Sequence, residues 1–548
     1  MRAADAVCRY LEAEGVSHVF GNPGTTEVPF MDALVDSPLR FVLCLQENVA
    51  VSAADGLAQA TRRPQVVNLH TGPGLAQGMS GLYMAAKHRS PLVVTVGNED
   101  TRFALTEPLL RGEVVEMARP LAKWAYETNS VDDVIPSLRR AFKVARTPPC
   151  GPVVLSWPMD VLAREVSDEL DLRPADLPSS PAPDPEAVER VASLLASAVN
   201  PAFVAGDDVG RTRCEELLMD VATRVGAKVF GAPLALFQNV PNTHPLHAGP
   251  LPPFPSIARA FLNGHDVVVV VGAKAFLLYY FQPVDPVPPD ATLVHVHPDP
   301  WELAKNYPTE VAVTATADRF LQALSGLVTT TAAAKERTAA AAASDARAAT
   351  ETWARAEAER VPLSAPGVVA MAHEVLGDVR VVDESVTASL HVRSAARLPD
   401  SDSYFGHKGG ALGWGASAAV GVALADPRRR VLCTLGDGSL MYVPQALYTA
   451  ARTRARITYV VFNNRGYAII KSGTRAAKGR AYETDTYIGM DIDDPPVDML
   501  SLARGLGAGA ASATTPDELR HALEASAAHE GPFLIDCATD RAIPDLPF

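Results

Sequence analysis

Cysteine is scarce in this chain of 548 residues, and none of its six cysteines belongs to a CxxC pair or to another metal-ligand spacing. Scattered cysteines within apolar runs are usually buried free thiols. The sequence therefore argues against a disulfide-stabilised scaffold and against a cysteine metal centre. It predicts a protein of the reducing cytoplasm.

Basic clusters and long apolar runs are also missing. The formal net charge is −14, which argues against nucleic acid or an anionic membrane as a partner and favours small molecules. No apolar run is long enough to cross a bilayer. Residues 1–20 predict an amphipathic helix that leads into a strand, rather than a signal peptide.

Short β-branched runs that alternate with helix-like segments are abundant, and they form three blocks. This pattern is typical of parallel sheets with crossover helices. We therefore expect an α/β protein with three doubly wound parallel-sheet domains, residues 1–170, 183–328 and 362–548. A proline-rich bridge (172–185) and an alanine-rich helical connector (329–360) separate them.

The third block contains the turn LGDGSL, residues 435–440, between an apolar strand and a segment (441–455) that predicts a helix. Such a turn can bind phosphate, because the first N–H groups of a helix are unpaired and its dipole favours negative charge. Asp437 adds a carboxylate to the same turn. A carboxylate that faces a phosphate predicts a hard cation such as Mg²⁺ between them.

A second polar strand end follows in the same block. Asn464 comes 27 residues after Asp437, at the end of the next strand. In a parallel sheet that spacing covers one strand, one helix and the next strand, so both turns open at the same carboxyl edge. Each turn alone could be ordinary; together they predict a metal site formed by the Asp437 carboxylate, the Asn464 amide oxygen and a backbone carbonyl.

This pair of motifs resembles the thiamine diphosphate signature of the pyruvate decarboxylase and acetolactate synthase superfamily, and the resemblance covers essentially the whole chain. It implies a pyrimidine-binding first domain, a central modified Rossmann domain and a diphosphate-binding last domain, with thiamine diphosphate and Mg²⁺ as cofactors. Leu412 would support the bent cofactor, although plain core packing would also explain it. The implied cofactor contacts are Thr387, Gly410, Leu412, Gly436, Asp437, Gly438, Ser439, Asn464, Gly466, Tyr467, Ala468 and Ile469.

Glu47 lies between a strand and a helix of the first block, in the segment LQENVAVSAADGLA. In this family an acid at such a position activates the cofactor: it hydrogen-bonds the pyrimidine ring, which can then take the C2 proton and form the ylid. The resemblance implies that role for Glu47. The alternative is that Glu47 only caps the helix that starts near Asn48.

Two further segments, FGNPGTTEVPF and VNLHTGPG, resemble the benzoylformate decarboxylase family. The resemblance implies that Thr25 touches the substrate carboxylate and that His70 moves protons, with Ile470 also in the substrate pocket. A satisfied structural histidine is the alternative for His70. The main departure is Phe281, or Tyr280 if the loop slips by one residue, which stands where that family has a second catalytic histidine.

Without that second histidine, the later proton transfer falls to His70, to water or to His407. We expect a thiamine-diphosphate- and Mg²⁺-dependent decarboxylase of a 2-oxo acid, similar to benzoylformate decarboxylase, that yields an aldehyde and CO₂, with carboligation as a second outcome. The alternatives are an acetolactate-synthase-like carboligase with FAD in the central domain, and a catalytically silent cofactor-binding protein. The resemblance also implies a homo-oligomer, a dimer or a tetramer, with active sites at subunit interfaces.

Overall fold

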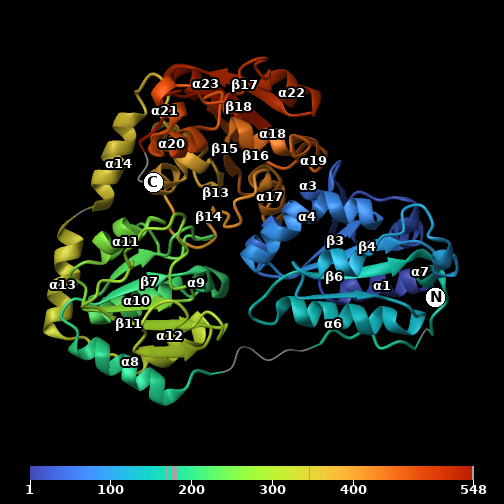
Figure 1. Cartoon of the computed structure of the whole chain (residues 1–548), viewed down its shortest axis with the longest axis horizontal. Coiled ribbons are helices and arrows are strands. Elements are labelled where there is room, and N and C mark those ends of the chain that lie inside the picture. Colours follow the sequence, from blue (N-terminus) through green and yellow to red (C-terminus); the bar gives the residue numbers. More distant parts are fainter. Residues whose placement is uncertain (168, 176–181, 345, 546–548) are drawn as a thin grey trace.

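The computed structural model describes residues 1–167, 169–175, 182–344 and 346–545, and it folds into three α/β units (Figure 1). Each unit contains a six-stranded sheet in which every strand pair is parallel. Helices cover the faces of the sheets. The structure therefore confirms the predicted fold class.

The first sheet has the strand order β2-β1-β3-β4-β6-β5. Its side chains alternate between two cores, because successive residues of a strand point to opposite faces. Phe20 and Val67 pack toward α3 and α4, whereas Val19 and Val66 pack toward α1 and α6. The strands are β1 His18–Gly21, β2 Arg40–Leu43, β3 Gln65–Leu69, β4 Leu92–Asn98, β5 Trp124–Glu127 and β6 Val153–Pro158. The helices are α1 Ala3–Ala13, α2 Val28–Ala33, α3 Glu47–Thr61, α4 Thr71–His88, α5 Val114–Ala118, α6 Val134–Arg146 and α7 Met159–Ala163.

The second sheet has the order β12-β11-β10-β7-β8-β9. Strand β10 consists of five buried valines, as expected for a central parallel strand that is covered on both faces. The strands are β7 Ala202–Ala205, β8 Lys228–Gly231, β9 His247–Pro250, β10 Val267–Val271, β11 Thr292–His297 and β12 Val311–Thr314. The helices are α8 Pro185–Ser197, α9 Asp207–Thr212, α10 Glu215–Val225, α11 Pro255–Leu262 and α12 Ala317–Ser325.

The alanine-rich connector forms two helices, α13 Ala332–Ala343 and α14 Ala346–Glu357, that run along the outside of the molecule from the second unit to the third (Figure 1). Ala334 and Ala354 are the buried positions among its described residues. The predicted helical connector is therefore present. Of the proline-rich bridge, residues 176–181 lie outside the described part of the chain.

The third sheet has the order β14-β13-β15-β16-β18-β17. The strands are β13 Arg380–Glu384, β14 Tyr404–Phe405, β15 Val431–Gly436, β16 Ile457–Asn463, β17 Gly509–Ala513 and β18 Phe533–Ala538. The helices are α15 Ala365–Leu376, α16 Ser389–Ala395, α17 Trp414–Ala425, α18 Asp437–Tyr442, α19 Ala446–Arg452, α20 Ala468–Ala476, α21 Arg480–Thr484, α22 Met499–Gly505 and α23 Pro516–Ala528.

One helix prediction was wrong in this unit. The segment 441–455 does not form one helix: α18 starts already at Asp437 and ends at Tyr442, and α19 begins at Ala446. Pro444 lies in the break. Its ring has no N–H group to donate and clashes with the preceding turn, so a continuous helix is disfavoured there.

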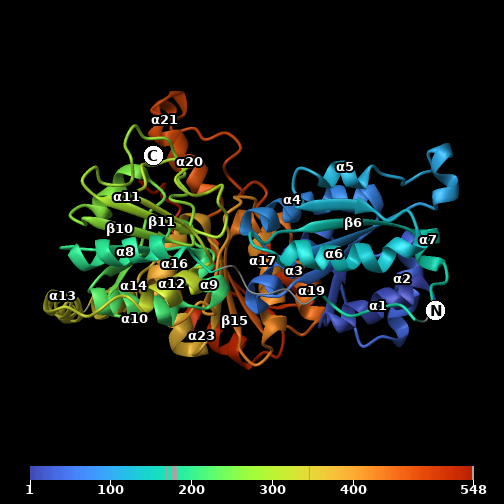
Figure 2. The same cartoon turned by 90° about the horizontal axis from the view of Figure 1, so that it is seen from below.

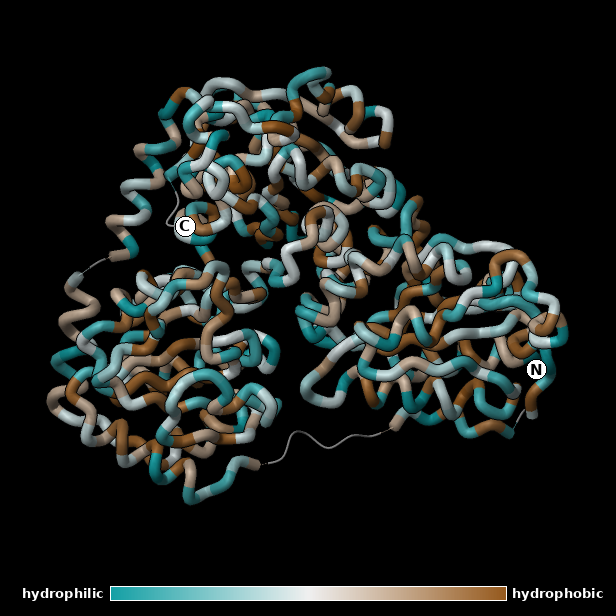
Figure 3. Tube along the Cα trace, in the orientation of Figure 1, coloured by the Kyte–Doolittle hydropathy of each residue, from teal (hydrophilic) through white to brown (hydrophobic). Residues whose placement is uncertain are grey.

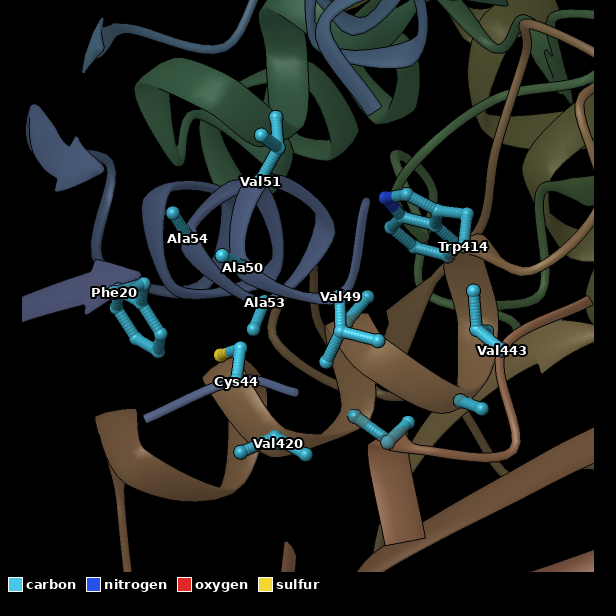
Figure 4. Close-up of a cluster of buried hydrophobic side chains, with 14 of the residues drawn as sticks. Phe20, Cys44, Val49, Ala50, Val51, Ala53, Ala54, Trp414, Val420 and Val443 are labelled. Carbon is cyan, nitrogen blue, oxygen red and sulfur yellow. The ribbon is translucent and has the colours of Figure 1, made fainter. Parts of the chain in front are cut away.

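The first and third units share a core through α3 and α17, which lie side by side at their junction (Figure 2). Two glycines allow the close approach. A Cβ atom on Gly56 would lie 2.2 Å from the Ala418 carbonyl oxygen, and one on Gly421 would lie 2.0 Å from the Ala53 carbonyl oxygen. Figure 4 shows the small and β-branched side chains around this contact, including Val49 and Ala53 of α3.

Apolar segments otherwise gather in the strands inside each unit, and polar segments lie toward the outside (Figure 3). Five cysteines are buried, Cys150 is half-buried, and all six are free thiols, as predicted. In the described part of the chain, no helix combines the length and the apolar character that a bilayer span requires.

Candidate active site

A cavity of about 470 Å³ opens at the carboxyl edge of the third sheet. The loops that follow β13, β15 and β16 line it, as the parallel topology requires. All of its lining residues belong to residues 360–544. Among them are most residues that the sequence predicted for this side of the site: Thr387, Leu412, Gly436, Asp437, Gly438, Ser439, Asn464, Gly466, Tyr467, Ala468, Ile469 and Ile470.

The carboxylate of Asp437 and the amide oxygen of Asn464 meet in this cavity. Asp437 Oδ2 and Asn464 Oδ1 both accept a hydrogen bond from the Gly466 N–H, each at 3.1 Å. Asp437 is 3% exposed, and burial raises its carboxyl pKa to about 6. No ion pair among the described residues involves it, so the charge lacks a cation.

This donor set fits a hard divalent cation. Mg²⁺ prefers oxygen ligands and is typically held by one or two carboxylates together with substrate phosphates. The described residues contain no group of three histidine, cysteine, aspartate or glutamate side chains that could hold a metal. The other ligands would therefore be neutral oxygens, such as those of Asn464 and of the backbone.

Two backbone features shape the cavity wall. A Cβ atom on Gly438 would lie 2.5 Å from the ring of Tyr467, so a side chain there would displace this ring. Val386 has a φ of 51°. A β-branched residue rarely adopts this left-handed conformation, and such strain is commonly found at ligand sites.

Gly410 and Leu412 lie on the loop before α17. Leu412 is half-buried and lines the cavity. Gly410 is exposed, has a φ of 74° and is not among the residues that line the cavity.

Apart from Phe281, the remaining predicted residues lie in the first unit, at the carboxyl edge of the first sheet. Glu47 is the first residue of α3, and Asn22 donates to Glu47 Oε1 at 3.3 Å. Gln46 caps the helix instead, because its side chain accepts the Val49 N–H at 3.0 Å. Gln46 therefore provides the side-chain cap, while Glu47 lies in the first turn of α3, where an acid also suits the helix dipole.

His70 lies directly before α4, and a carboxylate that the sequence analysis missed holds its ring. Glu27 is 2% exposed, and its Oε2 lies 2.8 Å from His70 Nδ1. Thr26 Oγ1 donates to the other Glu27 oxygen at 2.8 Å. With Nδ1–H donated to Glu27, the Nε2 atom of His70 remains free to exchange a proton.

Gly24 makes this arrangement possible, because a Cβ atom there would lie 2.3 Å from the His70 ring. The neighbouring Thr25 is exposed beside this pair. The sequence did contain a signal for Glu27, an acid six residues after Gly21, the last residue of β1. Its partner His70, however, is 43 residues away in the chain.

Within one chain, the structure does not bring the predicted residues of the first unit together with the cavity of the third unit. The cavity of the third unit has no lining residue from the first unit, and the side-chain hydrogen bonds of Glu47 and His70 go to Asn22, Thr26 and Glu27. Phe281 is 91% exposed on a loop of the second unit and is also outside the cavity.

His407 is a poor substitute for a second catalytic histidine. Its ring centroid lies 6.0 Å from that of Trp414, and burial lowers its pKa to about 4. It is therefore neutral near pH 7 and carries no proton that it could give as an acid.

Family models of known proteins match segments in all three units of the chain. Residues 1–116, 188–324 and 388–537 match the models of the N-terminal TPP binding domain, the central domain and the C-terminal TPP binding domain of thiamine pyrophosphate enzymes. Benzoylformate decarboxylase of Pseudomonas aeruginosa is 32% identical, over 97% of this chain and 98% of that protein. Acetolactate synthase isozyme 2 large subunit of Escherichia coli is 26% identical, over 99% of this chain and 96% of that protein.

A solved structure has the same overall fold. Benzoylformate decarboxylase from Polynucleobacter necessarius superposes with a TM-score of 0.89 and 28% sequence identity, and the match covers 100% of both chains.

Proposed function

Because this chain belongs to the thiamine pyrophosphate enzyme family, we propose that it is a Mg²⁺-dependent decarboxylase that converts a 2-oxo acid into an aldehyde and CO₂. The observation that carries the proposal is the convergence of Asp437 and Asn464 in the cavity of the third unit. The likeness to benzoylformate decarboxylases favours a 2-oxo acid that carries an aromatic ring.

Thiamine diphosphate, when bound, supplies a carbon nucleophile that adds to the substrate carbonyl and accepts the electrons that CO₂ leaves behind. Asp437, Asn464 and the Gly466 carbonyl would hold the Mg²⁺ ion of its diphosphate. Gly436, Gly438, Ser439 and Thr387 would surround the diphosphate itself. Leu412 would support the cofactor from the opposite wall of the cavity.

The chain's own proton-transfer groups come from the first unit. Glu47 would exchange a proton with the pyrimidine ring of the cofactor. His70 would give and take protons at the substrate through Nε2, while Glu27 fixes the ring through Nδ1. Thr25 would orient the substrate carboxylate, and Ile470 would contact the substrate side chain.

Since these two groups of residues lie apart within one chain, we propose that each active site forms between two chains. The first unit of one chain would supply Glu47 and His70, and the third unit of its partner would supply the cavity. This arrangement makes a dimer the smallest active species and allows a tetramer built from two dimers.

A carboligase is the second candidate, and the exposed Phe281 favours it. An imidazole at that position could give a proton to the substrate after loss of CO₂, whereas a phenyl ring cannot. Slower proton donation would favour bond formation with a second carbonyl compound, and the chain is also similar to an acetolactate synthase. A silent cofactor-binding protein is less well supported, because Glu47 is present and not used as a helix cap.

The deciding experiment is a screen of 2-oxo acids, including benzoylformate, ring-substituted benzoylformates and pyruvate, with the holoenzyme. CO₂ release is measured, and the products are identified by chromatography. Release of aldehyde alone supports the decarboxylase, hydroxyketone products support the carboligase, and no CO₂ from any 2-oxo acid contradicts both.

A further inference from the structure

Strand β13 ends in Glu384, a buried carboxylate that lies behind the cavity wall. Its side chain is 0% exposed. Oε1 accepts the Gly413 N–H at 2.6 Å, and Oε2 accepts the Gly415 N–H at 2.5 Å. A buried carboxylate is tolerated only where such donors replace its water shell. Among the described residues it has no ion-pair partner, so these two backbone groups are its main support.

The two glycines lie on either side of Trp414, the first residue of α17. Gly413 has a φ of 94°, and a Cβ atom there would lie 3.0 Å from Tyr442 Cβ. A Cβ atom on Gly415 would lie 2.7 Å from Glu384 Cβ. The turn into α17 is therefore closely fitted between the end of β13 and residues 442–443.

This turn decides where Leu412 enters the cavity, because Leu412 directly precedes Gly413. The segment 406–413 contains four glycines, and glycine loses more conformational freedom on ordering than any other residue. A segment of this kind needs fixed points. The two hydrogen bonds that Glu384 accepts provide such fixed points at the end of the segment that contacts the cavity.

A second buried acid holds the same helix start from the first unit. The indole N–H of Trp414 donates to Asp55 Oδ2 of α3 at 2.7 Å. Glu384 therefore fixes the backbone around Trp414, while Asp55 fixes its side chain.

We propose that Glu384 is a positioning residue of the cofactor site: its two hydrogen bonds hold the Gly410–Leu412 turn in the conformation that binds thiamine diphosphate. The proposal rests on the proposed use of the cavity for the diphosphate half of the cofactor. Glu384 does not touch the cofactor itself, since it is not among the residues that line the cavity.

The test is Glu384→Gln in the full-length chain. Glutamine keeps the size and one acceptor oxygen, but its NH₂ group would face one of the two glycine N–H donors. We expect the Kd for thiamine diphosphate, at saturating Mg²⁺, to rise by about 10–100-fold, the value of leaving a buried backbone N–H without an acceptor. Titration of the apoprotein, followed by tryptophan fluorescence, measures it. At saturating cofactor, kcat should return close to the parent value.

Asp208→Asn is the matched control. Asp208 is also a buried acid that accepts a backbone N–H, that of Ala317 at 2.7 Å, but it lies in the second unit, outside the cavity. The Asp208→Asn variant should have a lower thermal stability of the apoprotein, and its cofactor Kd should stay within twofold of the parent value.

If Glu384→Gln lowers stability like the control and leaves the cofactor Kd unchanged, Glu384 is only structural and the proposal is wrong. If the first variant does not fold, Gly413→Ala tests the same turn. A side chain at a φ of 94° and beside Tyr442 must shift the turn. An unchanged Kd in a folded Gly413→Ala variant would overturn the proposal equally. A parent chain that binds no thiamine diphosphate would instead overturn the proposed function.

Discussion

At the scale of single residues, Asp437 is the position on which the proposed cofactor site depends most. It is a buried carboxylate that forms no ion pair within the described part of the chain, and it lies where a Mg²⁺ ion would neutralise it. Asp437→Ala should remove the charged ligand and weaken binding of thiamine diphosphate with Mg²⁺ by at least about 100-fold, because breaking a buried charge pair costs about 3–5 kcal/mol. Isothermal titration of the apoprotein measures this effect.

The control for this prediction is Asp378→Ala in the same unit. The Asp378 side chain is 76% exposed and pairs with Arg429 at the surface, and exposed pairs of this kind contribute little to stability. Its loss should leave cofactor affinity unchanged. Equal affinity of the Asp437 variant and the parent would show that the metal is held elsewhere.

Glu47 and His70 should separate experimentally, because their proposed roles belong to different steps. Glu47→Gln keeps the size of the side chain but removes the exchangeable proton, so C2 hydrogen–deuterium exchange of bound cofactor should slow, and turnover should slow with it. His70→Ala should leave C2 exchange intact and lower turnover by about 10²–10⁴-fold. Quenched NMR measures exchange, and CO₂ release measures turnover. Slow exchange in the His70 variant would mean that the two roles are assigned the wrong way round.

At the scale of elements, the contact between α3 and α17 depends on its glycines. Gly56→Ala would place a methyl group against the Ala418 carbonyl oxygen. Alanine favours the helix by about 1 kcal/mol over glycine, but overpacking costs about 1–3 kcal/mol or more. We therefore expect a net loss of stability in urea unfolding.

Gly505→Ala in α22 is the matched control, because no heavy atom beyond its chain neighbours and the backbone of its own helix lies within 4 Å of a Cβ placed there. It should leave stability unchanged or raise it by about 0.4–1 kcal/mol. A Gly56 variant as stable as this control would show that the two helices can move apart without cost.

The elements also show what the sequence can and cannot predict. Strands such as β3 and β10 can be recognised in the sequence, because their β-branched runs are buried on both faces. Strand β17, with the sequence GAASA, and the two-residue strand β14 carry no such run. Their pairing with neighbouring strands defines them, and that pairing is not visible in local sequence.

The same contrast holds within the candidate site. The Asp437 and Asn464 turns were predictable because the parallel topology places successive strand ends at one edge. Glu27 and Glu384 were not predicted, because each is defined by partners 29 to 43 residues away. Only the folded chain shows that these carboxylates face a ring nitrogen or a pair of backbone N–H groups.

At the scale of the whole molecule, the separation of Glu47 and His70 from the cavity predicts an obligate oligomer. Light scattering of the holoenzyme should show a dimer or a tetramer, and dilution below the dissociation constant of the dimer should abolish turnover. An active monomer would contradict the proposal. Because thiamine diphosphate would then bridge two chains, its addition should also shift a partly dissociated sample toward the dimer.

The placement of the two half-sites on different units has a genetic consequence. Two inactive alleles, Glu47→Gln and Asp437→Ala, should complement each other when they are co-expressed. In a mixed dimer, one active site carries both defects and the other carries neither. With random assembly, half of the dimers are mixed, so about a quarter of all sites are intact, as the two-fold symmetry requires. Purification through two different affinity tags should enrich these mixed dimers to about half of the parent activity, whereas alleles of a site contained in one chain would recover none.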